Sequence, residues 1–304
     1  MAYHCIVCAK QVPDTKRITG QAMKEDGTVN RAALPAIFNP EDLNALELAL
    51  AIRDQFGGTV TLMTMGLPAA SEILREGLYR GVDKAMLITD RRAAASDTLA
   101  TSYILSCAIK MLPHDIVLCG RQAIDGDTAQ VGPQLAEKLG VAQITYVEQL
   151  VDLSGKTITA RRHVGNGFEV VEGKLPVLLT VMDTANVARP PAARKIMKYK
   201  KARTPAEVSG AVAKEMGEGA APEAVAAEAK KRCAALAARG LLIDQYDLDG
   251  IKADLTWCGR SGSPTKVHRI QSVVLTGSEH KAIAPTEDGI RELVAELIED
   301  HTIG

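Results

Sequence analysis

The sequence Cys-Gly-Arg-Gln-Ala-Ile-Asp-Gly-Asp-Thr-Ala-Gln-Val-Gly-Pro-Gln occupies residues 119–134 and decides the fold. It follows a short apolar run at residues 115–118, which predicts a buried strand, and precedes residues 135–140, which predict a helix closed by Gly140. Gly126 tolerates backbone angles that other residues resist, so we expect a tight turn there between two aspartates. The stretch is therefore expected to be a strand–loop–helix junction.

Two starts are possible for the helix after this loop. Asp127 and Gln130 have the spacing of a capping pair, which favours a first turn near Thr128 that is disturbed at Pro133. Alternatively the helix starts at Pro133, since a missing N–H is harmless at the first helical position. In both cases several backbone N–H groups remain exposed beside Thr128 and Gln130.

Exposed N–H groups at a strand-to-helix turn form a site for a phosphate. Asp125 would repel a phosphate, so we expect it to accept hydrogen bonds from ribose hydroxyls or to cap the turn. An ordinary surface loop rich in turn-forming residues has the same local features. The residues of the loop alone leave both interpretations open.

The chain before residue 142 alternates strands with helices. Strands are expected at residues 4–12, 59–65, 84–89 and 115–119, and helices at 43–55, 69–79 and 96–111. Asn39 as the N-cap and Pro40 at the first helical position mark the start of the first helix. This alternation predicts an α/β fold with a parallel sheet and helices on both faces, with ligands at the carboxyl ends of the strands.

After residue 142 the pattern changes. Short strands at residues 144–151, 157–163, 168–171 and 175–182 predict a β-rich flank. Residues 183–203 are strongly basic, and residues 205–230 predict a linker or a loose helix, because they lack an apolar stripe. A helix at 233–242, a strand at 268–275 and a last helix at 287–300 follow. We expect domains at 1–182 and 233–304, joined by a basic loop and linker at 183–232.

The composition excludes several classes of protein. The 304 residues are 46% hydrophobic and 24% charged, with a net charge of −1, which gives no field to attract nucleic acid. No apolar run could span a membrane and no signal peptide begins the sequence, so we expect a cytoplasmic protein without membrane insertion. Cys5 and Cys8 lie three apart on an expected strand and therefore face opposite sides, so we expect no metal site.

Residues 119–136 closely resemble the signature segment of the beta subunits of electron transfer flavoproteins. Three further segments resemble this family: residues 7–14 in the first strand, residues 39–42, and Met65-Gly66. The resemblance implies an adenine nucleotide-binding α/β domain, of the adenine nucleotide alpha-hydrolase-like type, with no catalytic acid or base of its own. The cofactor-binding residues that it implies are Ala9, Asn39, Asp42, Met65, Gly66, Gln122, Asp125, Gly126, Asp127, Thr128, Ala129, Gln130, Val131, Gly132, Pro133 and Gln134.

Residues 125–133 resemble the electron-bifurcating members of the family, which hold a second FAD in place of AMP. The resemblance then implies oxidation of NADH and partition of electrons between an acyl-CoA dehydrogenase family protein and ferredoxin or flavodoxin, together with an alpha subunit. We expect NADH at residues 66–90, where Arg75 and Arg80 lie beside a sheet-edge turn. The alternatives are an AMP-holding, non-bifurcating beta subunit and a non-redox adenine nucleotide-binding protein.

Residues 183–203 resemble the family's recognition loop for dehydrogenases. Lys198 matches the family's lysine, but Ala193 replaces the leucine that anchors this loop in respiratory members. Residues 262–267 resemble a Gly-Ser-Pro-Thr segment of the longer beta subunits. The C-terminal residues 233–304 are expected to pack on the alpha subunit.

Overall fold

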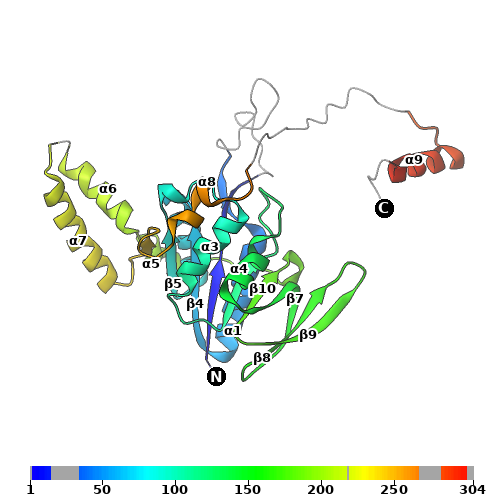
Figure 1. Cartoon of the computed structure of the whole chain (residues 1–304), viewed down its shortest axis with the longest axis horizontal. Helices are drawn as coiled ribbons and strands as arrows, with labels where there is room; N and C mark the ends of the chain where they lie inside the picture. Colours follow the sequence, from blue (N-terminus) through cyan, green and yellow to red (C-terminus); the bar gives the residue numbers. More distant parts are fainter. Residues whose placement is uncertain (1, 15–33, 218, 267–281, 300–304) are drawn as a thin grey trace.

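The computed structural model describes residues 2–14, 34–217, 219–266 and 282–299, and a nine-stranded sheet lies at its centre (Figure 1). Seven strands, in the order β11-β5-β4-β1-β6-β10-β7, are parallel, and β8 and β9 continue the sheet in antiparallel fashion. The parallel strands are β1 (Tyr3–Cys8), β4 (Gly58–Met65), β5 (Lys84–Ile88), β6 (Ile116–Gly120), β7 (Ala142–Ser154), β10 (Val177–Val181) and β11 (Asp244–Tyr246).

Helices cover both faces of this sheet. Helices α1 (Pro40–Phe56) and α2 (Ser71–Arg80) pack on one face, and α3 (Thr98–Ile109) and α4 (Val131–Leu139) pack on the other. Cys5 joins the core on the first face and Cys8 the core on the second, because successive strand residues alternate. The predicted α/β class and the predicted opposite orientation of the two cysteines are confirmed.

The first expected strand, residues 4–12, is divided in two. β1 ends at Cys8, and β2 (Gln11–Pro13) leaves the main sheet to pair with β3 (Ala36–Phe38) as a separate antiparallel ribbon. Ala9 and Lys10 make the change of direction. The backbone N–H of Lys10 donates to Asp42 (2.8 Å), which fixes the chain where it leaves the sheet.

Strands β7, β8 (Thr157–His163) and β9 (Phe168–Lys174) form the predicted β-rich flank. The fourth strand expected there has a different place. β10 returns to the parallel sheet and lies between β6 and β7, and all five of its residues are buried. An uninterrupted apolar run is the pattern of a strand that is covered on both faces.

A helical arm follows the sheet. It comprises α5 (Ala193–Tyr199), α6 (Pro205–Met216) and α7 (Pro222–Ala238), and α6 and α7 pair as a hairpin that projects from the body (Figure 1). Of the two alternatives for residues 205–230, the linker was wrong, and the helical one is confirmed as two well-formed helices and not a single loose one. A capping box between Thr204 and Glu207 starts α6, and a small apolar cluster holds the hairpin together.

The remaining chain returns to the body before α9. β11 joins the sheet edge, and η6 (Leu255–Trp257) and α8 (Gly259–Gly262) follow, while α9 (Glu287–Glu299) lies apart (Figure 1). Earlier in the described chain, three short 3-10 helices connect longer elements: η3 (Pro68–Ala70), η4 (Arg91–Ala93) and η5 (Asp183–Ala185).

Three expectations concern this last part of the chain. The helix expected at 233–242 is the end of α7, so the boundary expected at residue 232 falls inside that helix. The strand expected at 268–275 lies outside the described residues. Among the helices of the described segments, none is both long and apolar enough to cross a bilayer.

Candidate functional site

The carboxyl ends of β1, β4, β5 and β6 meet at one edge of the sheet. The Ala9 N–H donates to the Met63 carbonyl (2.8 Å) and the Gly66 N–H to that of Ile88 (3.0 Å), so the chain keeps contact with its neighbours as it leaves each strand. The chain runs from β1 outward to β4 and β5, and then returns to β6 on the other side of β1. This reversal of strand order is where α/β sheets bind ligands.

Asn39 ties the start of α1 to the loop after β6. It occupies the predicted N-cap position, but its side chain does not cap the helix. Instead Asn39 Nδ2 donates to the Gln122 carbonyl (2.9 Å), and Oδ1 accepts from the Ile124 N–H (3.1 Å). Asn39 is fully buried, so it positions the loop from behind and its side-chain groups are already used.

Asp42 and Glu41 make further contacts between the start of α1 and the ends of the neighbouring strands. The Asp42 carboxylate accepts from the N–H groups of Lys10 and Gly120, both at 2.8 Å, and so joins the ends of β1 and β6. Glu41 accepts from the Gln122 N–H (2.8 Å) and pairs with Arg121 (2.9 Å). Burial raises the pKa of Asp42 to about 7 against the opposing effect of its amide donors, and burial also raises the pKa of Glu41.

Gly120 is required by this close approach. A Cβ at this position would lie 2.6 Å from Asp42 Oδ1 and 2.7 Å from Glu41 Cβ. A side chain there would therefore push the start of α1 away from β6 and break the Asp42 bridge.

The loop after β6 has an unusual backbone. Asp127 (φ 48°) and Ala129 (φ 52°) adopt the left-handed conformation, whereas Gly126, where we expected it, does not. Left-handed residues other than glycine are uncommon, and they cluster at functional sites. Gln122 Nε2 donates to Asp127 Oδ1 (3.1 Å), which braces the turn from within.

Backbone N–H groups of residues 128–132 form the central feature of the site. Within the described residues, none of these five consecutive amides has a hydrogen-bond acceptor, and the loop around them is largely exposed. A left-handed residue next to a right-handed one, as at Ala129 and Gln130, turns successive N–H groups toward one concavity, a geometry that binds anions. The positive end of α4 adds to this preference.

Helix α4 starts at Val131, which differs from both predicted starts. Gln130 is the N-cap residue, without a side-chain capping bond, and Pro133 lies inside the first turn. The missing N–H of Pro133 is harmless there, because the first four amides of a helix have no internal acceptor. Gln130 Oε1 accepts from Thr98 Oγ1 (3.0 Å), so the start of α3 braces the loop.

The expected cofactor-binding residues have different places at this edge. Residues 125–131 form the exposed loop, and Ala9, Met65 and Gly66 lie at the neighbouring strand ends. Asn39 and Asp42 lie behind the loop and position it, as does Gly132, which packs on Thr180 and Cys119. Gln122 braces the turn, and Pro133 and Gln134 lie in the first turn of α4.

Sequence reasoning missed four contributors to this edge: Lys10, Glu41, Thr64 and Arg121. Lys10 and Glu41 lie directly beside predicted residues. Thr64 is buried at the end of β4, and its hydroxyl has no partner among the described residues; Arg121 Nε and Gln134 Oε1 are also buried without one. Unsatisfied polar atoms around the loop fit a polar ligand at this edge.

The two arginines beside which we expect NADH already form ion pairs within the chain. Arg75 is buried and pairs with Glu72 (2.7 Å) and Glu207 (3.0 Å), which joins α2 to α6. Arg80 pairs with Glu76 one turn earlier (3.2 Å). Neither guanidinium is available at the sheet edge.

The segment at residues 262–266 packs beside the site. Asp97, the N-cap of α3, accepts from the N–H and the hydroxyl of Thr265 (2.9 and 2.6 Å), and the Asp97 N–H donates to Ser263 Oγ (2.8 Å). This part of the C-terminal region therefore braces α3, which in turn contacts Gln130.

Comparison with known proteins agrees with this geometry. The electron transfer flavoprotein domain matches residues 26–215. The chain is 41% identical to an electron transfer flavoprotein subunit beta of Clostridium acetobutylicum over 98% of this chain and 99% of that protein. It is 39% identical to Protein FixA of Bradyrhizobium diazoefficiens, over 88% of this chain and 81% of that one.

A third relative is named for a larger assembly. The caffeyl-CoA reductase-Etf complex subunit CarD of Acetobacterium woodii is 48% identical over 60% of this chain and 70% of its own length. With its signature loop at the switch point of a parallel sheet, the chain belongs to the electron transfer flavoprotein beta-subunit family.

Proposed function

We propose that this chain is the nucleotide-holding beta subunit of an electron-bifurcating electron transfer flavoprotein, with FAD bound at the loop of residues 122–134. The observation that carries the proposal is the row of five amides at residues 128–132 without acceptors in the described chain. Backbone amides suit the phosphates of FAD or AMP equally. The similarity of residues 125–133 to bifurcating members favours FAD.

The chain's own residues bind and orient the cofactor. Asn39, Glu41 and Asp42 fix the loop, the five amides take the phosphates, and Ala9, Met65 and Gly66 line the adjoining strand ends. FAD would supply hydride acceptance from NADH and release of electrons to two acceptors. With only 3% aromatic residues in the chain, the flavin ring would be held mainly by aliphatic groups and by the alpha subunit.

The proposed partners follow from exposed parts of the chain. On α9, the apolar residues Ile290, Val294 and Ile298 recur at four-residue spacing, and each side chain is at least 42% exposed. We propose that this apolar stripe contacts the alpha subunit. In the basic segment, Met197 and Val187 are the exposed apolar residues that would replace the missing leucine at Ala193 in docking an acyl-CoA dehydrogenase family protein. Ferredoxin or flavodoxin would be the second acceptor.

The cofactor content of the purified heterodimer tests the proposal. Native mass spectrometry and flavin absorbance should give two FAD per heterodimer, with both bleached by NADH. One FAD together with one AMP would instead identify the non-bifurcating form. A chain that purifies without an alpha subunit, with ATP and no flavin, would overturn the electron-transfer assignment itself.

A variant with a matched control tests the loop directly. Ala129→Pro removes one of the five amides and forbids the left-handed backbone, so FAD content should fall severalfold. Gly167→Pro, in an exposed turn of the β-flank, should leave the FAD content unchanged. Equal FAD content in both variants would contradict phosphate binding by this loop.

A further inference from the structure

Lys10 crosses the candidate site from a neighbouring strand. It follows the end of β1, yet its Nζ reaches the loop after β6 and donates to both carboxylate oxygens of Asp125 (2.7 and 2.8 Å). The Lys10 side chain is 50% exposed and that of Asp125 22%. An exposed lysine–carboxylate pair of this kind is worth little to stability, so it can exchange partners readily.

The backbones on both sides of this ion pair are fixed. Asp42 accepts from the N–H of Lys10 and from that of Gly120, and the Lys10 carbonyl accepts from the N–H of Asn39 (3.0 Å). Asn39 also holds Ile124, the residue before Asp125. The Lys10–Asp125 pair can therefore open by movement of side chains, without a change in these backbone segments.

The negative charges of the loop would repel a phosphate, and the positive charge of Lys10 can offset this repulsion. Asp125 and Asp127 lie beside the amides of residues 128–132, where a phosphate would bind, and both carboxylates would repel it. Arg121 is held by Glu41 (2.9 Å), and its guanidinium lies 5.9 Å from the centre of the Tyr146 ring. Among the described residues, Lys10 is a half-exposed cation that already touches the loop, through Asp125.

We propose that Lys10 is a phosphate-binding residue of the nucleotide site and that it exchanges Asp125 for a phosphate oxygen when an adenine nucleotide binds. This inference rests on the proposed function and deepens it. In the structure the ammonium of Lys10 binds Asp125 at the start of the loop, and in the complex it joins the five amides around the phosphate. The ligand class is an adenine nucleotide with at least one phosphate.

Titration calorimetry with AMP and adenosine tests this on the full-length chain freed of bound nucleotide. Lys10→Met should weaken AMP binding about 10- to 100-fold, the value of a charge-assisted hydrogen bond, and leave adenosine binding unchanged. Lys10→Arg should restore most of the AMP affinity, and the salt dependence of AMP binding should fall in Lys10→Met. Equal loss of AMP and adenosine, or no loss of either, would overturn the proposal.

Asp125→Asn tests the exchange itself. It releases Lys10 and removes a repelling charge, so AMP should bind about three- to tenfold more tightly. Unchanged or weaker AMP binding would overturn the exchange. The unfolding free energy of each variant, expected to match the wild type because the ion pair is exposed, excludes misfolding as the cause.

Failure of this inference differs from failure of the proposed function. A wild-type chain that binds neither AMP nor FAD would contradict the nucleotide-binding role as a whole. A wild-type chain that binds AMP, with Lys10→Met binding it equally well, would contradict only the role of Lys10.

Discussion

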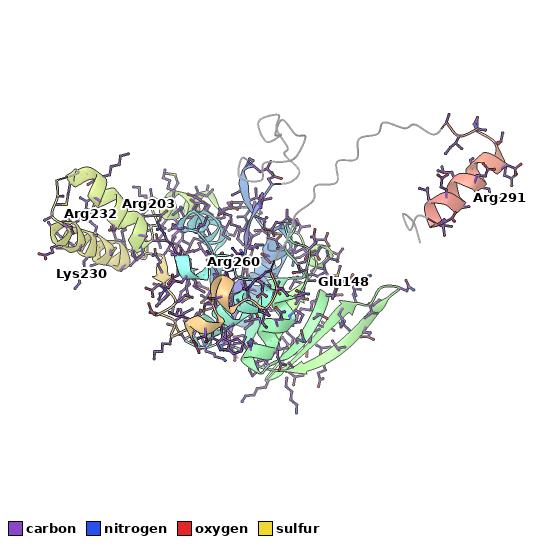
Figure 2. All side chains as sticks on the ribbon, turned by 45° about the horizontal axis from the view of Figure 1, so that its top comes forward. Glu148, Arg203, Lys230, Arg232, Arg260 and Arg291 are labelled. Atoms are coloured by element: carbon purple, nitrogen blue, oxygen red, sulfur yellow. The ribbon has the colours of Figure 1, made fainter. Side chains whose placement is uncertain are left out.

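The start of α1 and the α6–α7 arm use carboxylates in opposite ways. Asp42 is buried and accepts from backbone amides of two strand ends that are distant in sequence. Glu215 and Glu228 on the arm are exposed, and both bind Arg232 (2.7 and 2.8 Å; Figure 2 labels Arg232). Buried carboxylates directed at amides fix backbone geometry, whereas exposed ones compete with water and fix little.

Asn39→Ala should have the largest effect on stability. It leaves the Ile124 N–H and the Gln122 carbonyl without their partner and opens a small cavity. We expect a loss of about 4 kcal/mol in unfolding free energy, measured by urea denaturation, with a severalfold loss of FAD. Asn166→Ala, at an exposed turn, is the control and should change neither.

The pH dependence of stability should show the buried carboxylate of Asp42. Burial raises its pKa from the ordinary value of 3.8 to about 7, so the folded chain holds this proton more tightly than the unfolded chain. Its contribution to stability is therefore full below about pH 4 and is lost as the pH rises to about 7.

Across this pH range the wild type should lose on the order of 3 kcal/mol more than Asp42→Asn, which has no proton to release. Urea denaturation of both proteins at pH 4.5, 6 and 7.5 measures the difference. Parallel pH profiles would show that the amides of Lys10 and Gly120 keep the carboxylate ionised throughout.

Arg75→Met should have an intermediate effect at the joint between body and arm. It removes a buried guanidinium that bonds Glu207 and the Ala202 carbonyl (3.2 Å), and it leaves Glu207 partly buried without a cation. We expect a loss of about 2 kcal/mol, reduced from the cost of a fully buried pair because Glu207 is 26% exposed.

Arg80→Met is the control for Arg75→Met, since Arg80 pairs only within α2, and it should cost less than about 1 kcal/mol. If the proposed oxidation of NADH does not use these two arginines, the KM for NADH should be unchanged in both variants. A raised KM in Arg75→Met with normal stability would contradict this assignment.

Much of the fold, but less of the candidate site, could be predicted from the sequence. The parallel sheet and the edge that carries the candidate site were predictable, because apolar runs alternate with helix signals and the loop of residues 119–134 is distinctive. The position of Asn39 at the start of α1 was predicted, but its contacts with the loop were not, because an Asn directly before a helix predicts an N-cap. Its true partners, Gln122 and Ile124, are more than 80 residues away.

The arm was missed for a physical reason. Helix α7 has a single buried residue, Ala229, and α6 buries Val208 and Val212, so no apolar stripe of ordinary width is present. Alanine propensity, the Thr204–Glu207 capping box and the hairpin contact together make the helices. The left-handed backbone at Asp127 and Ala129 was likewise unpredictable, because neither residue demands it.

Arg232→Ala should have the smallest effect, although this arginine makes two short ion pairs. Both carboxylates are solvated, so the lost attraction is offset by regained hydration and side-chain freedom, and we expect no measurable shift in Tm. Val212→Ala is the counterpart, because Val212 is fully buried between α6 and α7. It should increase proteolysis within the arm while leaving FAD content intact. A larger effect for Arg232→Ala than for Val212→Ala would mean that charge, and not the small apolar cluster, holds the hairpin together, and the contrast with the start of α1 would then fail.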